Sequence, residues 1–155
     1  HHDDGKADHR FQSMLGGLRA EKELAKSEVR TRQETKISRQ RSGLPQGWRH
    51  EQMSVVLVTA QKAQGKLSCS DLALRIIGCS HGNGRNSFKH TDRILLQNVQ
   101  GFDSDILRQK AHDLFFIGRW EELIEETDMK FGPYVTAYLE ALERAADVQI
   151  SAEGH

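Results

Sequence analysis

Glycine residues divide this sequence into short segments whose apolar side chains recur at helical spacing. The chain holds 13 glycines but only two prolines, so the stretches between the glycines can remain helical. The β-branched stretch Ser54–Val58 would also suit a strand, but no strand–turn–strand pattern accompanies it. We therefore predict an all-α protein of short helices packed as antiparallel hairpins. The expected helical stretches are Met53–Ala63, Asp71–Ile77, Asp92–Val99, Asp105–Ile117, Arg119–Met129 and Tyr134–Ala146.

A chain of 155 residues suits a single domain. We expect residues 1–45 to form an N-terminal helix and a basic, partly extended arm, residues 46–150 a helical-hairpin domain, and residues 151–155 a tail. Two cysteines are too few for a disulfide framework, and no run of 18 apolar residues could span a membrane. The first ten residues do not begin with Met, which suggests added residues or a removed organellar presequence; we leave them out of the fold prediction.

Charge is distributed unevenly along the chain, although the formal net charge is zero. Residues 1–110 hold 19 Lys and Arg against 12 Asp and Glu, whereas residues 111–155 hold 3 against 10. The basic half contains the stretch Val29–Gly43, whose spacing suits a phosphate backbone. A solvated helix, or one that contacts protein, is the alternative for this stretch. The candidate nucleic-acid-binding residues are Arg30, Arg32, Lys36, Arg39 and Arg41.

An aromatic corner precedes the acidic part of the chain. Gly118 can supply the left-handed turn between two helices, and Trp120 directly after it is expected to be the buried wedge of the hairpin rather than an exposed anchor. The outward positions of the second helix are acidic and could dock a basic partner. These candidate protein-binding residues are Glu121, Glu122, Glu125 and Glu126.

The stretch from Ala111 to Pro133, "AHDLFFIGRWEELIEETDMKFGP", resembles the pentatricopeptide-repeat and tetratricopeptide-repeat families. Val56–Ile77 has a similar helix–Gly-Lys–helix form, and together the similar stretches cover less than half of the chain. Gly65 and Gly118 lie 53 positions apart, which departs from a regular repeat of about 34 residues. The resemblance implies helical hairpins that bind protein or RNA.

Two patterns could carry chemistry. Gly78–Gly82 has the form G-x-S-x-G, so Ser80 could be a nucleophile with Asp103 or Asp105 and His112 following in order. The preceding segment reads as a helix rather than the strand that a nucleophile elbow needs, so a serine hydrolase is the weaker alternative.

Metal ligands are the second pattern. The spacing of Cys69, Cys79, His81 and His90 does not match a compact zinc site, and no metal or other cofactor is expected. The acidic and histidine-rich beginning of the chain is expected to do no more than bind metal adventitiously. It comprises His1, His2, Asp3, Asp4 and His9.

These observations together predict a protein that is not an enzyme. We expect a subunit of an organellar ribonucleoprotein or ribosome-associated complex, located in the mitochondrial or another organellar matrix and otherwise cytoplasmic. Its partners would be other protein subunits and RNA. The alternative of another class is a protein-binding adaptor or accessory subunit of a membrane-associated complex.

Overall fold

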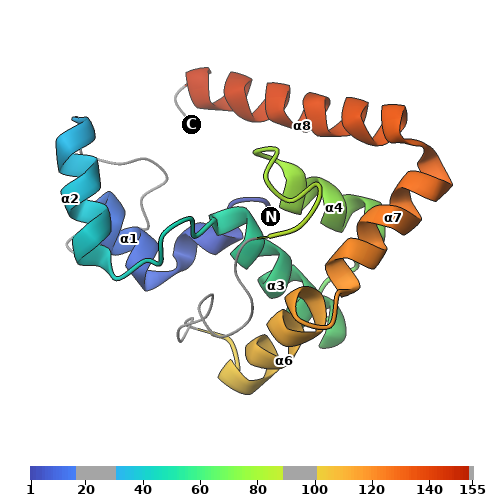
Figure 1. Ribbon diagram of the computed structural model, residues 1–155, viewed down its shortest axis with the longest axis horizontal. Coiled ribbons are helices and arrows are strands. Elements are labelled where there is room, and N and C mark those ends of the chain that lie inside the picture. Colours follow the sequence, from blue (N-terminus) through green and yellow to red (C-terminus); the bar gives the residue numbers. More distant parts are fainter. Residues whose placement is uncertain (17–30, 89–100, 154–155) are drawn as a thin grey trace.

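The computed structural model describes residues 1–16, 31–88 and 101–153, and within these ranges the chain is helical and contains no strand (Figure 1). The all-α prediction is confirmed. The predicted stretch Asp92–Val99 lies outside the described residues. The elements are the 3-10 helix η1 (Asp4–Ala7) and the helices α1 (His9–Leu15), α2 (Arg32–Ser42), α3 (His50–Ala63), α4 (Asp71–Cys79), α6 (Ser104–Phe115), α7 (Arg119–Phe131) and α8 (Pro133–Glu153).

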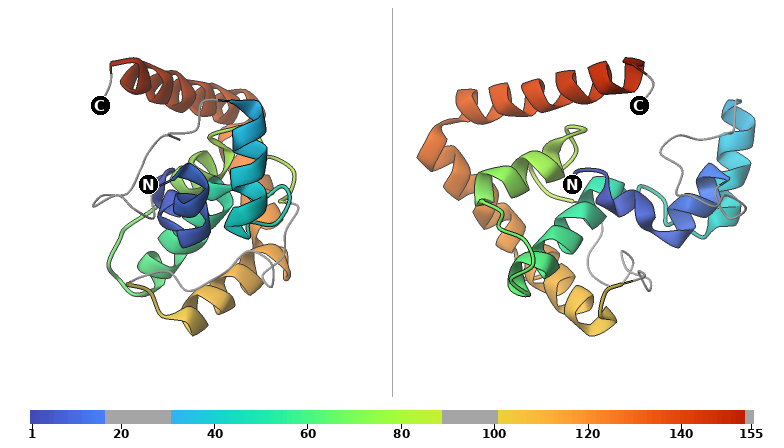
Figure 2. Two further views of the ribbon diagram at one scale, coloured as in Figure 1. Left: turned by 90° about the vertical axis from the view of Figure 1, so that its left-hand side faces the viewer. Right: turned by 180° about the vertical axis from the view of Figure 1, so that it is seen from behind.

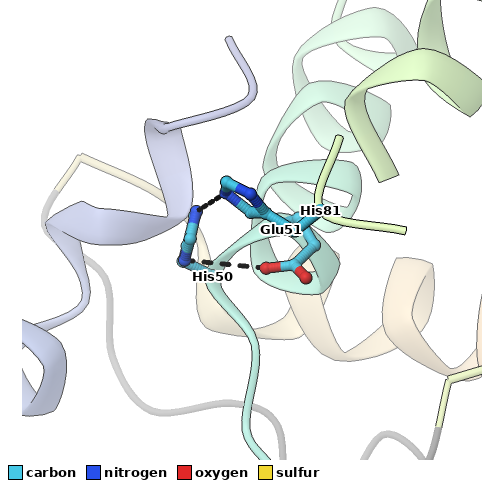
Figure 3. A group of neighbouring side chains, drawn as sticks. All are labelled: His50, Glu51 and His81. Atoms are coloured by element: carbon cyan, nitrogen blue, oxygen red, sulfur yellow. Dashed lines mark hydrogen bonds and ion pairs between the residues drawn. The ribbon is translucent and has the colours of Figure 1, made fainter. Parts of the chain in front are cut away.

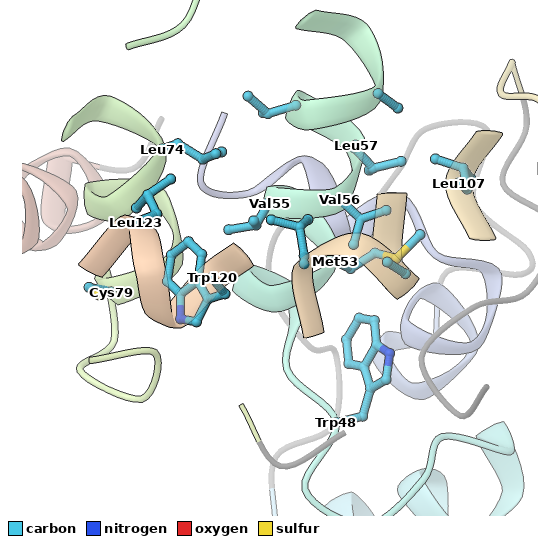
Figure 4. Packing of buried hydrophobic residues seen from close by; sticks show 14 of the residues in the cluster. Trp48, Met53, Val55, Val56, Leu57, Leu74, Cys79, Leu107, Trp120 and Leu123 are labelled. Carbon is cyan, nitrogen blue, oxygen red and sulfur yellow. The ribbon is translucent and has the colours of Figure 1, made fainter. Parts of the chain in front are cut away.

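Helix α3 is the centre of the fold, with η1, α4 and α6 packed around it (Figures 1 and 2). The run from Met53 to Val58 is buried on every side, which explains why its β-branched sequence would also have suited a strand. Figure 4 shows these side chains meeting residues of α4, α6 and α7. Their burial removes the largest block of apolar surface in the molecule from water.

Side-chain caps and glycine corners set where the helices begin. Ser70 Oγ accepts a hydrogen bond from the backbone N–H of Ala73 at 3.2 Å, and α4 begins there as predicted. Asp103 caps α6 in the same way, through the N–H groups of Asp105 and Ile106. Gly118 adopts φ 99° between α6 and α7, a conformation that side-chain-bearing residues rarely adopt.

Trp120 is fully buried, which confirms its predicted role as the wedge of this corner. Its indole Nε1 donates to the carbonyl of Gly84 at 2.8 Å, and its ring lies 5.3 Å from that of Phe88. The close approach of Gly78 leaves no room for a larger residue, because a Cβ there would clash with the Trp120 ring. The wedge thus joins α4, the loop that follows it, and α7.

The first residues of the chain are part of the packed structure. Figure 1 shows the N-terminus beside the start of α3. The buried Ser54 hydroxyl accepts a hydrogen bond from the N–H of Gly5 at 2.8 Å and lies 2.7 Å from the carbonyl oxygen of His2. Gly5 packs so closely on α3 that a Cβ would clash with the backbone of His50. Leaving these residues out of the fold prediction therefore missed one side of the core.

The final helix differs from its sequence pattern in the surface that it exposes. Tyr134, Tyr138 and Leu142, which form the regular apolar stripe of α8, are 89%, 62% and 47% exposed. The face that packs on α4 and α7 instead carries Thr136 and Glu140, both fully buried. Within the described residues no helix is long and apolar enough to cross a membrane.

Candidate metal centre

Seven imidazole and carboxylate side chains from four separate segments meet beside the N-terminus of the chain. Two come from the residues before η1, two from the first turn of α3, one from the loop after α4 and two from the second half of α8. We call this group the imidazole–carboxylate cluster. It comprises His2, Asp3, His50, Glu51, His81, Glu143 and Asp147.

The first turn of α3 forms one half of the cluster. His50 Nε2 lies 3.1 Å from His81 Nε2, and His50 Nδ1 lies 3.6 Å from the Glu51 carboxylate (Figure 3). Glu51 is completely buried, and its Oε2 has no hydrogen-bond partner. One potential ligand atom from each of these three residues lies within 4.8 Å of the others, so they could hold one cation.

The N-terminal segment and α8 form the other half. His2 Nε2 lies 3.4 Å from Asp3 Oδ1 and 3.3 Å from Asp147 Oδ1, and these three residues form a second group that could hold a cation. Glu143 lies one helical turn before Asp147, and its carboxylate is 3.4 Å from His2 Nδ1. The two halves are therefore each a mixed imidazole and carboxylate set.

Asp3 joins the two halves. Its Oδ2 accepts a hydrogen bond from Lys6 Nζ at 2.7 Å, while its Oδ1 lies 3.5 Å from His50 Nε2 and has no hydrogen-bond partner. Burial alone would raise the pKa of Asp3, but the Lys6 hydrogen bond and the neighbouring positive charges lower it overall. The carboxylate is therefore ionised at neutral pH, with one oxygen directed between the imidazoles.

The protonation state of His50 also suits a ligand. Burial, together with the neighbouring His81, lowers the pKa of His50 to about 4. The imidazole is consequently neutral at neutral pH, which is the form that binds a metal ion without first losing a proton.

The chemistry of the cluster fits divalent metal ions. Buried polar atoms without partners are unfavourable in a folded protein, yet four lie together here: His2 Nε2, Asp3 Oδ1, Glu51 Oε2 and Glu143 Oε2. Imidazole nitrogens with carboxylate oxygens form the donor set of first-row transition ions. A cation could be coordinated by these atoms, none of which forms a hydrogen bond within the described residues.

The sequence analysis gave these residues no functional role. It set His2 and Asp3 aside as adventitious, and of the four zinc ligands that it weighed the structure brings only His81 to the cluster. His90 lies outside the described residues, and burial raises the pKa of Cys79 to about 12, away from a ligating thiolate. A signal was present in the imidazole–carboxylate doublets His2-Asp3 and His50-Glu51, although His112-Asp113 has the same form and lies outside the cluster.

The predicted serine nucleophile is not supported by its geometry. Ser80 follows the last residue of α4, and its hydroxyl is buried without a hydrogen-bond partner, so it contacts neither His112 nor an aspartate. A nucleophilic serine needs a hydrogen-bonded base.

The predicted binding residues lie outside the cluster. Arg32, Lys36, Arg39 and Arg41 are on α2, whereas Arg30 lies outside the described residues. Arg39 donates to the carbonyl of Trp48 at 3.2 Å, just before the start of α3. The four glutamates Glu121, Glu122, Glu125 and Glu126 are on α7, which contributes nothing to the cluster.

A comparison with protein families identifies one match, the family described as "Cas3, HD domain", over residues 1–151. Comparisons with curated proteins and with solved structures found no similar protein. The match spans nearly the whole chain, including the N-terminal residues that the sequence analysis left aside. The resemblance to pentatricopeptide- and tetratricopeptide-repeat proteins was therefore wrong: a helix–Gly–helix corner with a tryptophan wedge is a general solution to packing two helices, and it occurs here in a different family.

Proposed function

This chain belongs to the Cas3 HD domain family, whose members are metal-dependent, phosphohydrolase-type nuclease domains, and we propose that it hydrolyses phosphodiester bonds of nucleic acid at the imidazole–carboxylate cluster. The single observation that carries this proposal is the convergence of His2, Asp3, His50 and His81 with buried carboxylate oxygens that lack partners.

The family membership corrects four predictions at once. The chain was expected to be a non-catalytic subunit of an organellar ribonucleoprotein, whereas a nuclease domain is an enzyme. The RNA-binding, mitochondrial and helical-repeat descriptions conflict with it as well, and the adaptor and serine-hydrolase alternatives are no better supported. The prediction was wrong because it relied on the charge pattern of single helices. Such a pattern indicates which helix face is exposed, but it does not show which residues far apart in the sequence meet in a reactive site.

Several residues have definable tasks in this reaction. A divalent cation held by the cluster would supply a nucleophile from water at neutral pH and stabilise the negative charge on the phosphate oxygens. The ring nitrogens of His50 and His81 face each other and could both bind the cation. Asp3 lies between the two halves, and its Oδ1 forms no hydrogen bond. Lys6 holds the other oxygen of Asp3 and so fixes the orientation of the carboxylate.

Ser54 keeps the two halves of the cluster together. Its hydroxyl accepts the hydrogen bond from Gly5 and lies near the carbonyl oxygens of both His2 and His50, at 2.7 and 3.0 Å. Because this contact is buried, it fixes the distance between the N-terminal segment and α3. A shift of the order of 1 Å between reacting groups can lower a rate about 100-fold.

The proposal is tested with the chelator-stripped full chain and two substrates, bis(p-nitrophenyl) phosphate and a labelled oligonucleotide. We expect no hydrolysis until Mn²⁺ is added, and loss of the restored activity in His81→Ala. His9→Ala, which changes an exposed histidine at the start of α1 outside the cluster, is the matched control. Full activity in excess chelator, or equal activity of the two variants, would overturn the proposal.

A further inference from the structure

Two arginines line a groove whose bordering residues are neighbours of the imidazole–carboxylate cluster. A depression of about 100 Å³ is bordered by Gly47, Arg49, Gln52 and Asn83. It adjoins a more open depression of about 530 Å³, because Gly47 and Arg49 also border the latter together with Arg39. We call the two together the arginine groove.

Asn83 connects the groove with the cluster. Arg49 directly precedes His50, and Asn83 follows His81 by two positions. Asn83 Nδ2 donates to Glu51 Oε1 at 3.4 Å, while Asn83 Oδ1 accepts from Arg49 Nη2 at 3.3 Å. A ligand in the groove would therefore lie one side-chain layer from the groups that we assign to hydrolysis.

The charges of the groove are not neutralised by the protein. Arg10, Arg75 and Arg85 each face a carboxylate. Arg49 instead meets the neutral Asn83, and Arg39 meets the carbonyl of Trp48, with no acidic partner for either among the described residues. Arg49 is exposed, so most of its guanidinium donors remain free for an anion.

The geometry points to the arginine groove as the subsite for the nucleic-acid backbone next to the scissile phosphate, with Arg49 and Arg39 binding successive phosphate groups. This inference rests on the proposed function for the identity of the ligand. Planar guanidinium groups bind phosphate oxygens in pairs, and such contacts set the register of a strand without reading its bases. Arg49 is also the N-cap residue of α3, so an anion bound at Arg49 would lie near the positive end of this helix.

The test measures binding separately from hydrolysis. Fluorescence anisotropy of a labelled oligothymidylate is recorded with the full chain in EDTA, where turnover does not occur, across a series of salt concentrations. We expect Arg49→Gln to weaken binding about tenfold and to reduce the slope of log K against log salt by about 1. Arg39→Gln should act in the same direction, and Arg49→Lys should be intermediate.

The matched control is Arg108→Gln. Arg108 is an exposed arginine on α6, pairs with Asp105 and borders neither depression. It should bind like the wild type. Melting temperatures of all variants show whether they fold; if Arg39→Gln is destabilised because it loses Trp48, Arg49→Gln alone decides the question.

Hydrolysis of the oligonucleotide gives a second readout. In Mn²⁺ we expect Arg49→Gln to raise KM about tenfold while kcat changes less than about threefold. Binding by Arg49→Gln equal to that of Arg108→Gln, or a fall in kcat at unchanged KM, would overturn the subsite. A wild-type chain that binds the oligonucleotide but hydrolyses no phosphodiester would defeat the proposed function alone, whereas hydrolysis of bis(p-nitrophenyl) phosphate without oligonucleotide binding would defeat the subsite alone.

Discussion

Two buried polar clusters lie along the same face of α8, and they differ in whether their charges are balanced. The first, which we call the Arg75 cluster, consists of Arg75, Arg85, Asp128 and Glu140. The second is the imidazole–carboxylate cluster, to which α8 contributes Glu143 and Asp147. Positions 140, 143 and 147 are successive neighbours on one helix face, so a single helix serves both.

The Arg75 cluster is complete within the protein. Two cations face two carboxylates, and both oxygens of Glu140 accept charged hydrogen bonds, from Arg75 at 3.1 Å and from Arg85 at 2.6 Å. Burial alone would lower the pKa of Arg75, but its hydrogen bonds to Asp128 and Glu140 raise it above the ordinary value. This cluster fastens α4, α7 and α8 to one another.

The charges and hydrogen bonds of the imidazole–carboxylate cluster, in contrast, are not balanced within the protein. It holds four carboxylates against Lys6 and a neutral His50, and four of its buried polar atoms lack hydrogen bonds. Buried polar atoms that lack hydrogen bonds distinguish a candidate binding centre from a structural ion pair whose atoms are hydrogen-bonded. The comparison teaches that the Arg75 cluster holds α8 in position, and that this position places Glu143 and Asp147 in the centre for which we propose a cation.

The largest expected effect is on activity, from a change of one atom in Asp3. Asp3→Asn removes the charge that joins the two halves of the cluster, and we expect kcat to fall on the order of 1000-fold, equivalent to about 4 kcal/mol of transition-state stabilisation. The measurement is Mn²⁺-dependent hydrolysis of bis(p-nitrophenyl) phosphate.

The neighbouring aspartate provides the control. Asp4 pairs with His1 at 2.7 Å and lies outside both cation-binding groups. Asp4→Asn should stay within about threefold of the wild-type kcat. If both variants lose activity equally, the assignment of the cluster fails.

The second expected effect is on stability, from the Arg75 cluster. Glu140→Gln leaves the buried Arg75 and the half-exposed Arg85 without their shared carboxylate, so the free energy of unfolding in EDTA should fall by about 3–5 kcal/mol. Urea denaturation measures it. Glu122→Gln, which breaks the exposed pair with Arg119, should cost less than about 1 kcal/mol. If both variants lose the same small amount of unfolding free energy, the Arg75 cluster does not stabilise the fold.

The smallest effects are expected from substitutions of two glycines. One of them packs in the core and the other beside the imidazole–carboxylate cluster, so the two variants distinguish an effect on stability from an effect on metal binding. In Gly78→Ala the new Cβ would clash with the Trp120 ring, and overpacking should cost about 1–3 kcal/mol of stability with little change in Mn²⁺ affinity. In Gly5→Ala the Cβ would clash with the His50 backbone and push the N-terminal segment away from α3. Mn²⁺ affinity should then fall about tenfold, or ~1.4 kcal/mol. Calorimetric titration with Mn²⁺ distinguishes the two, and the reverse order of affinities would contradict the comparison.

The scaffold was predictable from the sequence because its determinants are local. The Ser70 and Asp103 caps and the Gly118 corner depend on residues within a few positions of each other. The exposed stripe of α8 shows where local reasoning ends: periodicity identifies a helix, but it does not decide which face packs, and buried charges at Glu140 reversed the expected face.

The site was not predictable in the same way. His2 and Asp147 stand near opposite ends of the chain, and only the packing of η1 on α3 and of α8 on α4 brings them within 3.3 Å. The N-terminal segment buries a glycine rather than a hydrophobic stripe, so no periodicity indicated that it belongs to the core. Adjacent imidazole and carboxylate residues, at His2-Asp3 and His50-Glu51, were the local trace of the centre.

The central claim, that the imidazole–carboxylate cluster binds a divalent cation, is tested most directly by calorimetric titration of the chelator-stripped chain with Mn²⁺. The account predicts saturable binding by the wild type and by Asp4→Asn, accompanied by a rise in melting temperature, and a loss of both in Asp3→Asn and His50→Ala. Absence of binding by the folded wild-type chain, or equal binding by wild type and Asp3→Asn, would contradict it.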